Sequence, residues 1–253
     1  MSERPKLSLI TLARNEEALI GDCLKSAWFC DERIVVDSFS TDRTVEIAHE
    51  LGATVFQHEF EGFSRQRKYA LDRASGAWVL ILDADEQATH DLGDEILRTI
   101  ASPAAADGYR VQRLLYHLGH YYPPAMIRDL PLRLFRRERA EIAGRDPHDK
   151  VIVAGRVGRL ENPILHFSYR DIADHVETIN RLSSDSAGKT EPGSFSALKM
   201  LTDPVWRFLS VYFLRGGFRD GGRGFYLAAT NAIYGFLKYA KLYERRLNSR
   251  KQL

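Results

Sequence analysis

Two aspartates, Asp83 and Asp85, follow an apolar segment at a spacing that could bind a divalent cation. Residues 78–82 predict a buried strand, and Asp83-Ala84-Asp85 comes directly after it. Two carboxylates in this arrangement form a compact set of hard oxygen ligands, which suits Mg²⁺ or Mn²⁺ bridging a diphosphate. An isolated D-x-D sequence is more often a solvated acidic turn, so the prediction depends on the elements around it.

Those elements alternate between strand and helix over the first half of the chain. Strands are predicted over 6–12, 33–37, 53–57 and 78–82, and helices over 16–27, 41–51 and 63–74. This alternation predicts an α/β domain with a mostly parallel sheet flanked by helices. Ligands of such sheets bind beyond the carboxyl ends of the strands. The polar segments 13–16, 37–42 and 83–86 each follow a predicted strand, so we expect them to converge at one sheet edge.

Composition and missing motifs exclude several classes of protein. The 253 residues carry a net charge of +2, with 28% charged and 44% hydrophobic residues, which is typical of a globular protein and not of a disordered one. Two cysteines, Cys23 and Cys30, make no disulfide framework and indicate a reducing compartment. We expect no secretory signal and no transmembrane helix. The absence of G-x-G-x-x-G after the first strand and of a P-loop sequence disfavours a dinucleotide dehydrogenase and a P-loop nucleotidase.

Three segments resemble the signature segments of family 2 glycosyltransferases. They are Thr11-Leu-Ala-Arg-Asn-Glu-Glu17, Val35-Val-Asp-Ser-Phe-Ser-Thr-Asp-Arg-Thr44 and Leu80-Ile-Leu-Asp-Ala-Asp-Glu86. Further segments are similar to a subgroup of lipopolysaccharide core glucosyltransferases of the WaaE type: Leu132-Arg-Leu-Phe-Arg-Arg137, Pro147-His-Asp-Lys-Val151, Leu165-His-Phe-Ser-Tyr-Arg170 and Tyr212-Phe-Leu-Arg-Gly-Gly-Phe-Arg-Asp-Gly221. The resemblance spans nearly the whole chain. It implies the GT-A fold, which is Rossmann-like, and a hexosyltransferase that uses a nucleotide-sugar donor.

The resemblance also implies a donor site and a metal site. The donor-binding residues that it implies are Thr11, Ala13, Asn15, Glu16, Asp37, Arg67 and Asp83. Asp85 would hold Mn²⁺ or Mg²⁺, with His166 as a further ligand or phosphate contact. The family usually has a second acid after Asp37, where this chain has Ser38, so base recognition differs in detail. The alternative for Arg67 is a surface charge on a basic helix.

The reaction needs a general base, because the acceptor hydroxyl loses a proton as it attacks. Asp149 matches the family's position for this base, where relatives often have Glu, and Asp146 and Glu141 are the next choices. The alternative for Asp149 is a loop ion pair with Lys150. Two further residues, His148 and Arg133, would orient the base or the acceptor.

Residues 171–253 differ from the catalytic domain, which we place at 1–170. They predict an amphipathic helical extension, and residues 200–253 carry ten Lys or Arg against three acids, a net charge of +7. Its aromatic and basic residues, including Lys238, Lys241 and Arg245, suit the interface of an anionic membrane. The alternative is a helical hairpin packed on the catalytic domain or on a second subunit, which would make a homo-oligomer. Nucleic acid is disfavoured because the charges are interleaved with apolar residues.

These observations predict an inverting, metal-dependent glycosyltransferase, peripheral to the inner membrane on its cytoplasmic side. The resemblance implies UDP-glucose as the donor and a lipid-linked saccharide, such as the lipopolysaccharide inner core, as the acceptor. One alternative is a family 2 transferase for another glycan, such as a capsule or protein glycan. Another is a non-catalytic protein that binds sugar nucleotides, which the retained Asp83, Asp85 and Asp149 disfavour.

Overall fold

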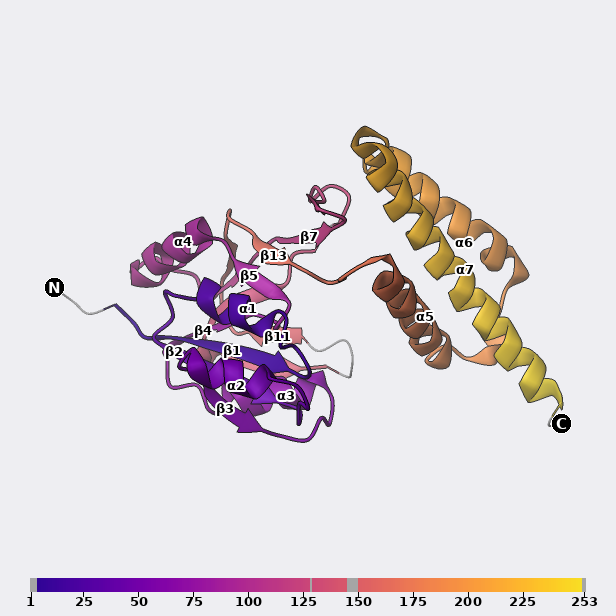
Figure 1. The fold of residues 1–253 in the computed structure, drawn as a ribbon. Helices are drawn as coiled ribbons and strands as arrows, with labels where there is room; N and C mark the ends of the chain where they lie inside the picture. The colour runs from indigo at the N-terminus through magenta and orange to yellow at the C-terminus, as the bar shows by residue number, and fades with distance from the viewer. Residues whose placement is uncertain (1–3, 128, 145–149, 252–253) are drawn as a thin grey trace. The chain divides into compact units, whose positions relative to one another are not determined.

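The computed structural model describes residues 4–127, 129–144 and 150–251 (Figure 1). The chain forms two compact units, Met1–Leu115 with Arg128–Ser168, and Tyr116–Ile127 with Tyr169–Leu253. The segment 116–127 lies inside the range predicted for the catalytic domain, but it packs with the C-terminal helices. His120 lies 3.0 Å from Asp220, and Arg215 donates a hydrogen bond to the carbonyl of Met126.

The first unit is built on a mostly parallel sheet, as the sequence predicts. Within the described residues it has seven strands in the order β12-β6-β9-β4-β1-β2-β3. Strands β4, β1, β2 and β3 run parallel, β9 is antiparallel to β4 and β6, and β12 is parallel to β6. The bounds are β1 Leu7–Ala13, β2 Glu32–Asp37, β3 Thr54–Gln57, β4 Trp78–Ile81, β6 Gly108–Arg110, β9 Leu132–Arg136 and β12 Val157–Arg159. The predicted α/β fold class is therefore confirmed.

Alternating side chains of these strands build one core on each face of the sheet. The helices are α1 Ile20–Ser26, α2 Thr44–Glu50, α3 Phe63–Leu71 and α4 His90–Ala101. Leu9 and Leu80 share a core with α1, α2 and α4, whereas Ile10 and Ile81 share the opposite core with α3. The hairpin of β10 Ala140–Ala143 and β11 Lys150–Val153, which follows the short 3₁₀ turn η1 Arg137–Arg139, joins the α3 side. Successive strand residues point to opposite faces, so an unbroken apolar strand serves both cores.

A smaller sheet lies next to the D-x-D sequence. Its strands are β5 Glu86–Ala88, β13 Ile164–His166, β7 Arg113–His117 and β8 His120–Tyr121, in that order. His166 is the partner of Glu86 in the β13–β5 register, and the amide of Phe167 donates to the carbonyl of Asp85 at 2.8 Å. This pairing brings the late histidine to the D-x-D sequence from far along the chain.

Two helices begin later than the sequence predicts. Helix α1 begins at Ile20 instead of residue 16, and α2 begins at Thr44 instead of residue 41. The reason is that the two preceding loops bond to each other. The amide of Glu16 donates to Thr44 Oγ1 at 2.7 Å, and that of Glu17 to Asp42 Oδ2 at 3.1 Å.

The second unit consists mainly of three helices, α5 Ile172–Gly188, α6 Ala197–Leu209 and α7 Gly221–Lys251. Helices α5 and α6 both pack on α7 (Figure 1). Short turns connect them: η2 Pro192–Ser194, the π-helical turn η3 Ser210–Leu214 and η4 Gly217–Asp220. Within the described residues, none of the helices combines the length and the apolar character that crossing a bilayer requires.

Candidate active site beyond strand β4

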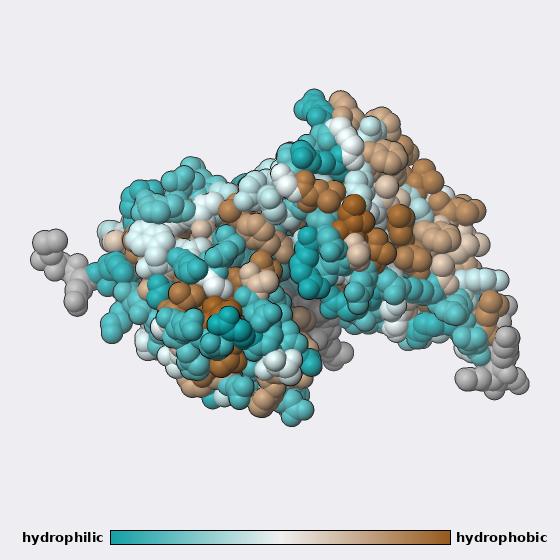
Figure 2. All heavy atoms as spheres, viewed as in Figure 1, coloured by the Kyte–Doolittle hydropathy of each residue, from teal (hydrophilic) through white to brown (hydrophobic). Residues whose placement is uncertain are grey.

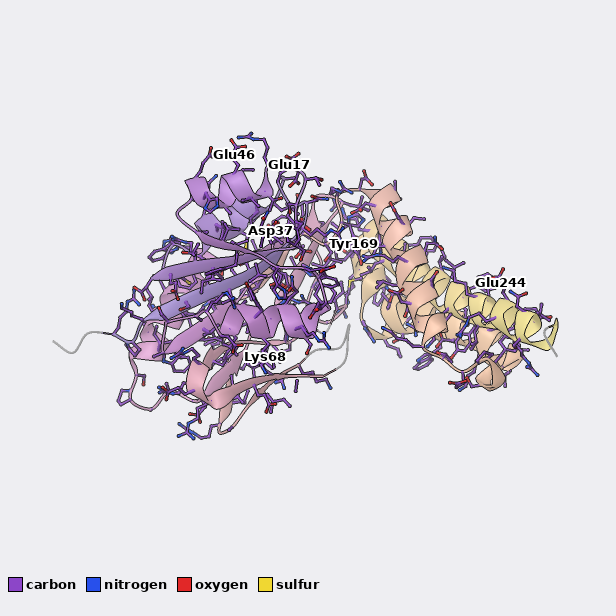
Figure 3. All side chains as sticks on the ribbon, turned by 90° about the horizontal axis from the view of Figure 1, so that it is seen from below. Glu17, Asp37, Glu46, Lys68, Tyr169 and Glu244 are labelled. Atoms are coloured by element: carbon purple, nitrogen blue, oxygen red, sulfur yellow. The ribbon has the colours of Figure 1, made fainter. Side chains whose placement is uncertain are left out.

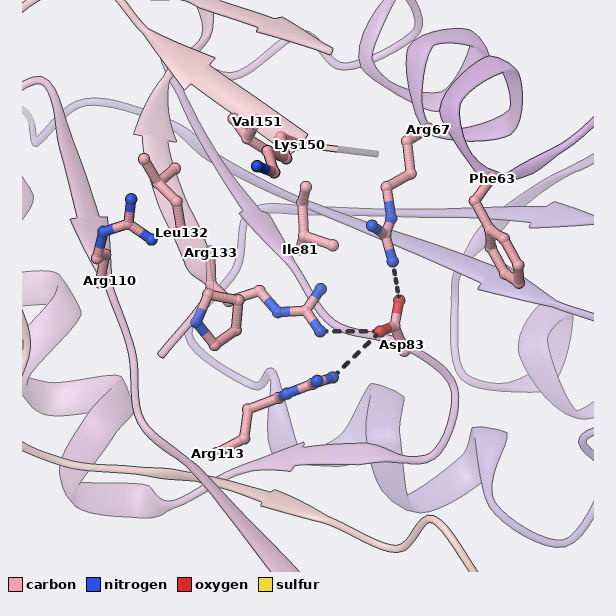
Figure 4. A pocket seen from close by; sticks show the side chains of 11 residues that line it. Phe63, Arg67, Ile81, Asp83, Arg110, Arg113, Leu132, Arg133, Lys150 and Val151 are labelled. Carbon is pink, nitrogen blue, oxygen red and sulfur yellow. Dashed lines mark hydrogen bonds and ion pairs between the residues drawn. The ribbon is translucent and has the colours of Figure 1, made fainter. Parts of the chain in front are cut away.

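The carboxylate of Asp83 lies just beyond the end of β4 and is held by arginines from three other elements (Figure 4). Arg67 of α3 donates to Oδ1 at 2.8 Å, and Arg133 of β9 donates to Oδ2 at 2.8 Å. Arg113 of β7 approaches Oδ2 at 3.8 Å. Both oxygens of Asp83 therefore have guanidinium partners, and these side chains come together although they lie far apart in the sequence.

A second carboxylate, that of Glu86, binds two of these arginines and the backbone of Asp83. Its side chain is fully buried and accepts hydrogen bonds from Arg113 at 2.7 Å, from Arg133, and from the amide of Asp83 at 3.0 Å. Arg113 also donates to Asp129 at 2.7 Å. Buried charges of this kind are tolerated only when each is paired and hydrogen-bonded. Glu86 and Arg113 were not among the predicted site residues.

The charges in this cluster shift one another's ionisation. Burial opposes the charge of Asp83, but Arg133 and Arg67 outweigh it and hold the pKa of the Asp83 carboxyl well below its usual range. Burial also opposes the charge of Arg133, and Asp83 and Glu86 outweigh it and raise the pKa of that guanidinium. For Glu86, burial raises the pKa and the neighbouring Asp83 adds to the effect. Asp83 is therefore an anion at neutral pH, fixed in place by its arginines.

Asp85 has a different environment and is the better candidate for a metal ligand. Its Oδ2 lies 3.2 Å from Nε2 of His166, and about a third of the Asp85 side chain is exposed. Ser168 is within hydrogen-bonding distance of the His166 ring. A carboxylate and an imidazole are both ligands that Mn²⁺ accepts, and such ions commonly take their remaining ligands from substrate phosphates and water. Within the described parts of the chain, no group of three or more His, Cys, Asp or Glu is arranged to hold a metal ion by itself.

The loops predicted to bind the donor also come together. Ala13 and Asp37 are register partners on β1 and β2. Asn15, whose φ of 56° is left-handed, accepts a hydrogen bond from the Thr41 amide at 2.8 Å, and its own amide donates to Ser40 Oγ at 2.8 Å. Asp37 is buried and accepts from the Ser40 amide at 2.9 Å. Thr11 is buried on β1, two residues before Ala13, the last residue of the strand.

The rim of this edge carries further acidic side chains. Glu17 accepts from the amide of Arg43 at 3.0 Å, and Glu46 accepts from the Arg43 side chain at 2.9 Å, which brings Glu17 and Glu46 close together (Figure 3). At position 38, the hydroxyl of Ser38 accepts a hydrogen bond from the buried Gln66 at 2.9 Å. Helix α3 therefore supplies, through Gln66, a hydrogen-bond partner for the Ser38 side chain.

A cavity of about 530 Å³ opens beside Asp83 (Figure 4). Among the described residues that line it, the charged ones are Asp83 and five cationic side chains: Arg67, Arg110, Arg113, Arg133 and Lys150. Arg67 and Arg133 were predicted, whereas Arg110, Arg113 and Lys150 were not assigned to the site. The excess of positive charge favours an anionic ligand, for which arginine offers paired donors.

The predicted base and its neighbour, Asp149 and His148, lie outside the described residues, as does Asp146. The next residue, Lys150, begins β11 and lines the cavity. Glu141, the other substitute for the base, is exposed on β10. The assignment of Asp149 therefore stays a prediction from the sequence.

Comparisons with known proteins agree with this geometry. A family model described as Glycosyl transferase family 2 matches residues 8–153. The chain is 32% identical to a protein of Rhizobium meliloti (strain 1021), described as lipopolysaccharide core biosynthesis glycosyltransferase LpsC, over 94% of this chain and 92% of the relative. Among solved structures, the mannosyltransferase PcManGT from Pyrobaculum calidifontis, in complex with GDP-Man and Mn²⁺, has a TM-score of 0.57 at 17% identity, covering 96% of this chain and 89% of that one. S. aureus TarS 1-349 has a TM-score of 0.51 at 16% identity, covering 98% and 91%. Both solved structures share the fold.

Proposed function

Because this chain belongs to glycosyl transferase family 2, we propose that it transfers a hexose with inversion, in a reaction that needs a divalent metal. The donor is UDP-glucose, as the motif resemblance implies, and the acceptor is a lipid-linked saccharide such as the lipopolysaccharide inner core. The description of the Rhizobium relative supports this acceptor class. The observation that carries the proposal is the basic cavity at the end of β4, with Asp83 fixed by arginines and Asp85 facing His166.

The donor lies across the edge where β1, β2 and β4 end. The loop of Thr11, Ala13, Asn15 and Glu16, together with Asp37, surrounds the base and ribose, and Asp83 accepts a ribose hydroxyl. The basic side chains of the cavity attract the diphosphate, which carries the opposite charge. Arg67, which donates a hydrogen bond to Asp83, lies between the ribose and the diphosphate of the donor.

Asp85 and His166 would hold Mn²⁺ or Mg²⁺. When bound, the ion supplies Lewis acidity, which stabilises the negative charge that develops on the departing nucleoside diphosphate. Both carboxylate oxygens of Asp83 already accept hydrogen bonds from arginines. Asp85 would therefore be the aspartate that binds the ion. His148 and Arg133 orient the general base or the acceptor.

Asp149 acts as the general base. As the acceptor oxygen attacks the anomeric carbon, the bond from that carbon to the diphosphate oxygen breaks on the opposite face, and the acceptor proton passes to the Asp149 carboxylate. The transition state is oxocarbenium-like, and a single displacement inverts the anomeric configuration. Support for this role comes from the sequence, in which Asp149 directly precedes Lys150, a residue that lines the cavity.

The enzyme acts at the cytoplasmic face of the inner membrane as a peripheral protein. A lipid-linked acceptor stays in the bilayer, so the enzyme must come to it, and the basic C-terminal helices suit an anionic surface.

A donor screen by calorimetry tests the proposal, because it identifies nucleotide and sugar together. With Mn²⁺ present, UDP-glucose should bind more tightly than UDP-galactose, UDP-N-acetylglucosamine or GDP-mannose. Tighter binding of another nucleotide sugar overturns the donor assignment. Tight UDP-glucose binding without transfer to a lipid-linked saccharide overturns the acceptor assignment, and leaves a transferase for another glycan or a non-catalytic binding protein.

A further inference from the structure

The side of α6 that packs on α7 carries both polar and apolar residues, and its Phe208 contacts Phe225 of α7 with ring centres 5.6 Å apart. Asp203 and Arg207 form an ion pair at 2.6 Å, one turn apart, and both side chains are partly buried. They contact α7 at Gly235: a Cβ at this position would lie 2.6 Å from Asp203 Oδ2 and 2.7 Å from Arg207 Cδ. The Arg207 guanidinium also lies 5.3 Å from the ring centre of Tyr234. The packed side of α6 therefore includes a half-buried salt bridge beside its apolar residues.

The opposite side of α6 is apolar and exposed. Leu198, Leu201, Val205 and Leu209 recur at helical spacing, with exposed fractions of 69%, 66%, 58% and 41%. No residue of α6 is fully buried. A helix of a globular protein normally buries such a stripe, so an exposed one marks a surface that another apolar phase covers.

The apolar surface continues beyond the end of α6. Phe213 and Leu214 of η3 and Phe218 of η4 are exposed, as is Trp206 on the flank of the stripe. Figure 2 shows apolar side chains in a band over the part of the chain that holds α6 and α7. We name the eight exposed side chains the α6–η3 face: Leu198, Leu201, Val205, Trp206, Leu209, Phe213, Leu214 and Phe218.

The charges around the α6–η3 face are mainly positive. Lys199, Arg215 and Arg219 are exposed on the same elements. The acids there are engaged, Asp203 by Arg207 and Asp220 by His120 at 3.0 Å. An apolar face with a tryptophan, bordered by exposed cations, is the composition of helices that lie in the interface of an anionic bilayer.

We propose that the α6–η3 face inserts into the headgroup region of an anionic lipid bilayer and holds the enzyme there. The inference deepens the proposed function, because it rests on an acceptor that stays in the membrane. A second copy of the chain is a poorer occupant. A two-fold dimer through this face would place the same patch opposite itself, so the second copy would bring further cations and no unengaged acid to Lys199, Arg215 and Arg219.

Two basic residues of α7, Lys241 and Arg245, form hydrogen bonds within the second unit. Lys241 of α7 donates to the carbonyl and side-chain oxygens of Asn180, at 2.6 and 2.7 Å, and to Ser183 at 2.8 Å. Arg245 donates to the carbonyl of Thr190 at 2.9 Å. These two cations bind α7 to α5 and the segment after it. The membrane contact that we propose on α6 and η3 therefore does not depend on Lys241 or Arg245.

Vesicle flotation of the full chain tests this assignment. The variant Leu198→Gln with Leu201→Gln removes apolar area from two side chains that are about two-thirds exposed, so its fold should persist. A matched control, Val176→Gln with Leu182→Gln, changes exposed apolar residues of α5 with fractions of 54% and 42%. The probes are vesicles of equal parts phosphatidylglycerol and phosphatidylethanolamine, and vesicles of phosphatidylcholine alone, each at low and high salt.

The wild type and the α5 control should float with the anionic vesicles and much less with phosphatidylcholine. The α6 variant should bind at least about tenfold more weakly, since each lost leucine removes more than one methylene of burial. Equal flotation of the α6 variant overturns the proposal. So does a wild type that never floats but is a dimer by light scattering and becomes a monomer in the α6 variant, since a second copy then covers the face. Vesicle binding is measured without donor or acceptor, so failure of sugar transfer leaves this outcome intact.

Discussion

Replacing Arg133 tests how much the buried ion pairs of Asp83 and Glu86 contribute to the free energy of unfolding. Its side chain is almost fully buried and bonds both Asp83 and Glu86. Arg133→Met leaves Glu86 with Arg113 and Asp83 with Arg67. Breaking a buried ion pair by removing one partner costs about 3–5 kcal/mol. Since both carboxylates keep one arginine, we expect the lower end of this range, about 3 kcal/mol.

A double-mutant cycle separates this coupling from a loss of packing. Glu86→Gln alone leaves Arg133 bonded to Asp83, and the double variant removes opposite charges together. The double variant should therefore be less destabilised than the sum of the two single variants, by about 1–3 kcal/mol.

The assay is urea unfolding followed by tryptophan fluorescence in a Trp206→Phe background. This substitution removes the tryptophan of the second unit, so the two that remain, Trp28 and the buried Trp78, both report on the first. Arg65→Met is the matched control, because its ion pair with Glu61 is exposed and should contribute less than about 1 kcal/mol. An Arg133→Met variant within about 1 kcal/mol of wild type, or additive single effects, would refute the reasoning.

Three further predictions follow from the site and from the second unit. Asp85→Asn should abolish most Mn²⁺-dependent UDP-glucose affinity in calorimetry while the fold persists, and equal affinity in wild type and variant, with and without EDTA, would remove Asp85 from the metal site. Asp149→Asn should keep donor affinity but lower turnover by about 10²–10⁴, and near-normal turnover would move the role of the base to Asp146 or Glu141. Burial, with a smaller effect of His117, lowers the pKa of His175 to about 4, so the unfolded chain binds more protons between this value and the unfolded pKa of about 6.5. The second unit should therefore lose up to about 3 kcal/mol as pH falls through this range, and His175→Phe, compared by the slope of unfolding free energy against pH, should lack this loss.

The strands and the position of the D-x-D sequence could be predicted because their signals are local. The segment at 78–82 is apolar without interruption, and it forms β4, which is buried on both faces. The starts of α1 and α2 could not be predicted from their own residues. Hydrogen bonds between the two loops, such as that from Glu16 to Thr44, compete with the helical turns that the sequence favours.

The arginines around Asp83 show a different limit. Arg113 and Glu86 lie on strands of the smaller sheet, and their meeting with Arg133 depends on how that sheet pairs. The sequence signal was the position of Glu86 next to the D-x-D sequence, and nothing local pointed to Arg113. In the C-terminal helices, a packed and an exposed apolar stripe share one periodicity. Only the contacts of the folded chain show that Asp203 lies on the side of α6 that packs on α7, and that Lys241 donates a hydrogen bond to Ser183 of α5.

The stereochemistry of the transferred sugar tests the central claim most directly. The wild-type enzyme is incubated with UDP-glucose, Mn²⁺ and a lipid-linked inner-core saccharide, and the anomeric configuration of the product is read by proton NMR. We predict a β-linked glucose from the α-linked donor, with no product when EDTA replaces Mn²⁺. An α-linked product, or undiminished transfer in EDTA, would contradict an inverting, metal-dependent transferase.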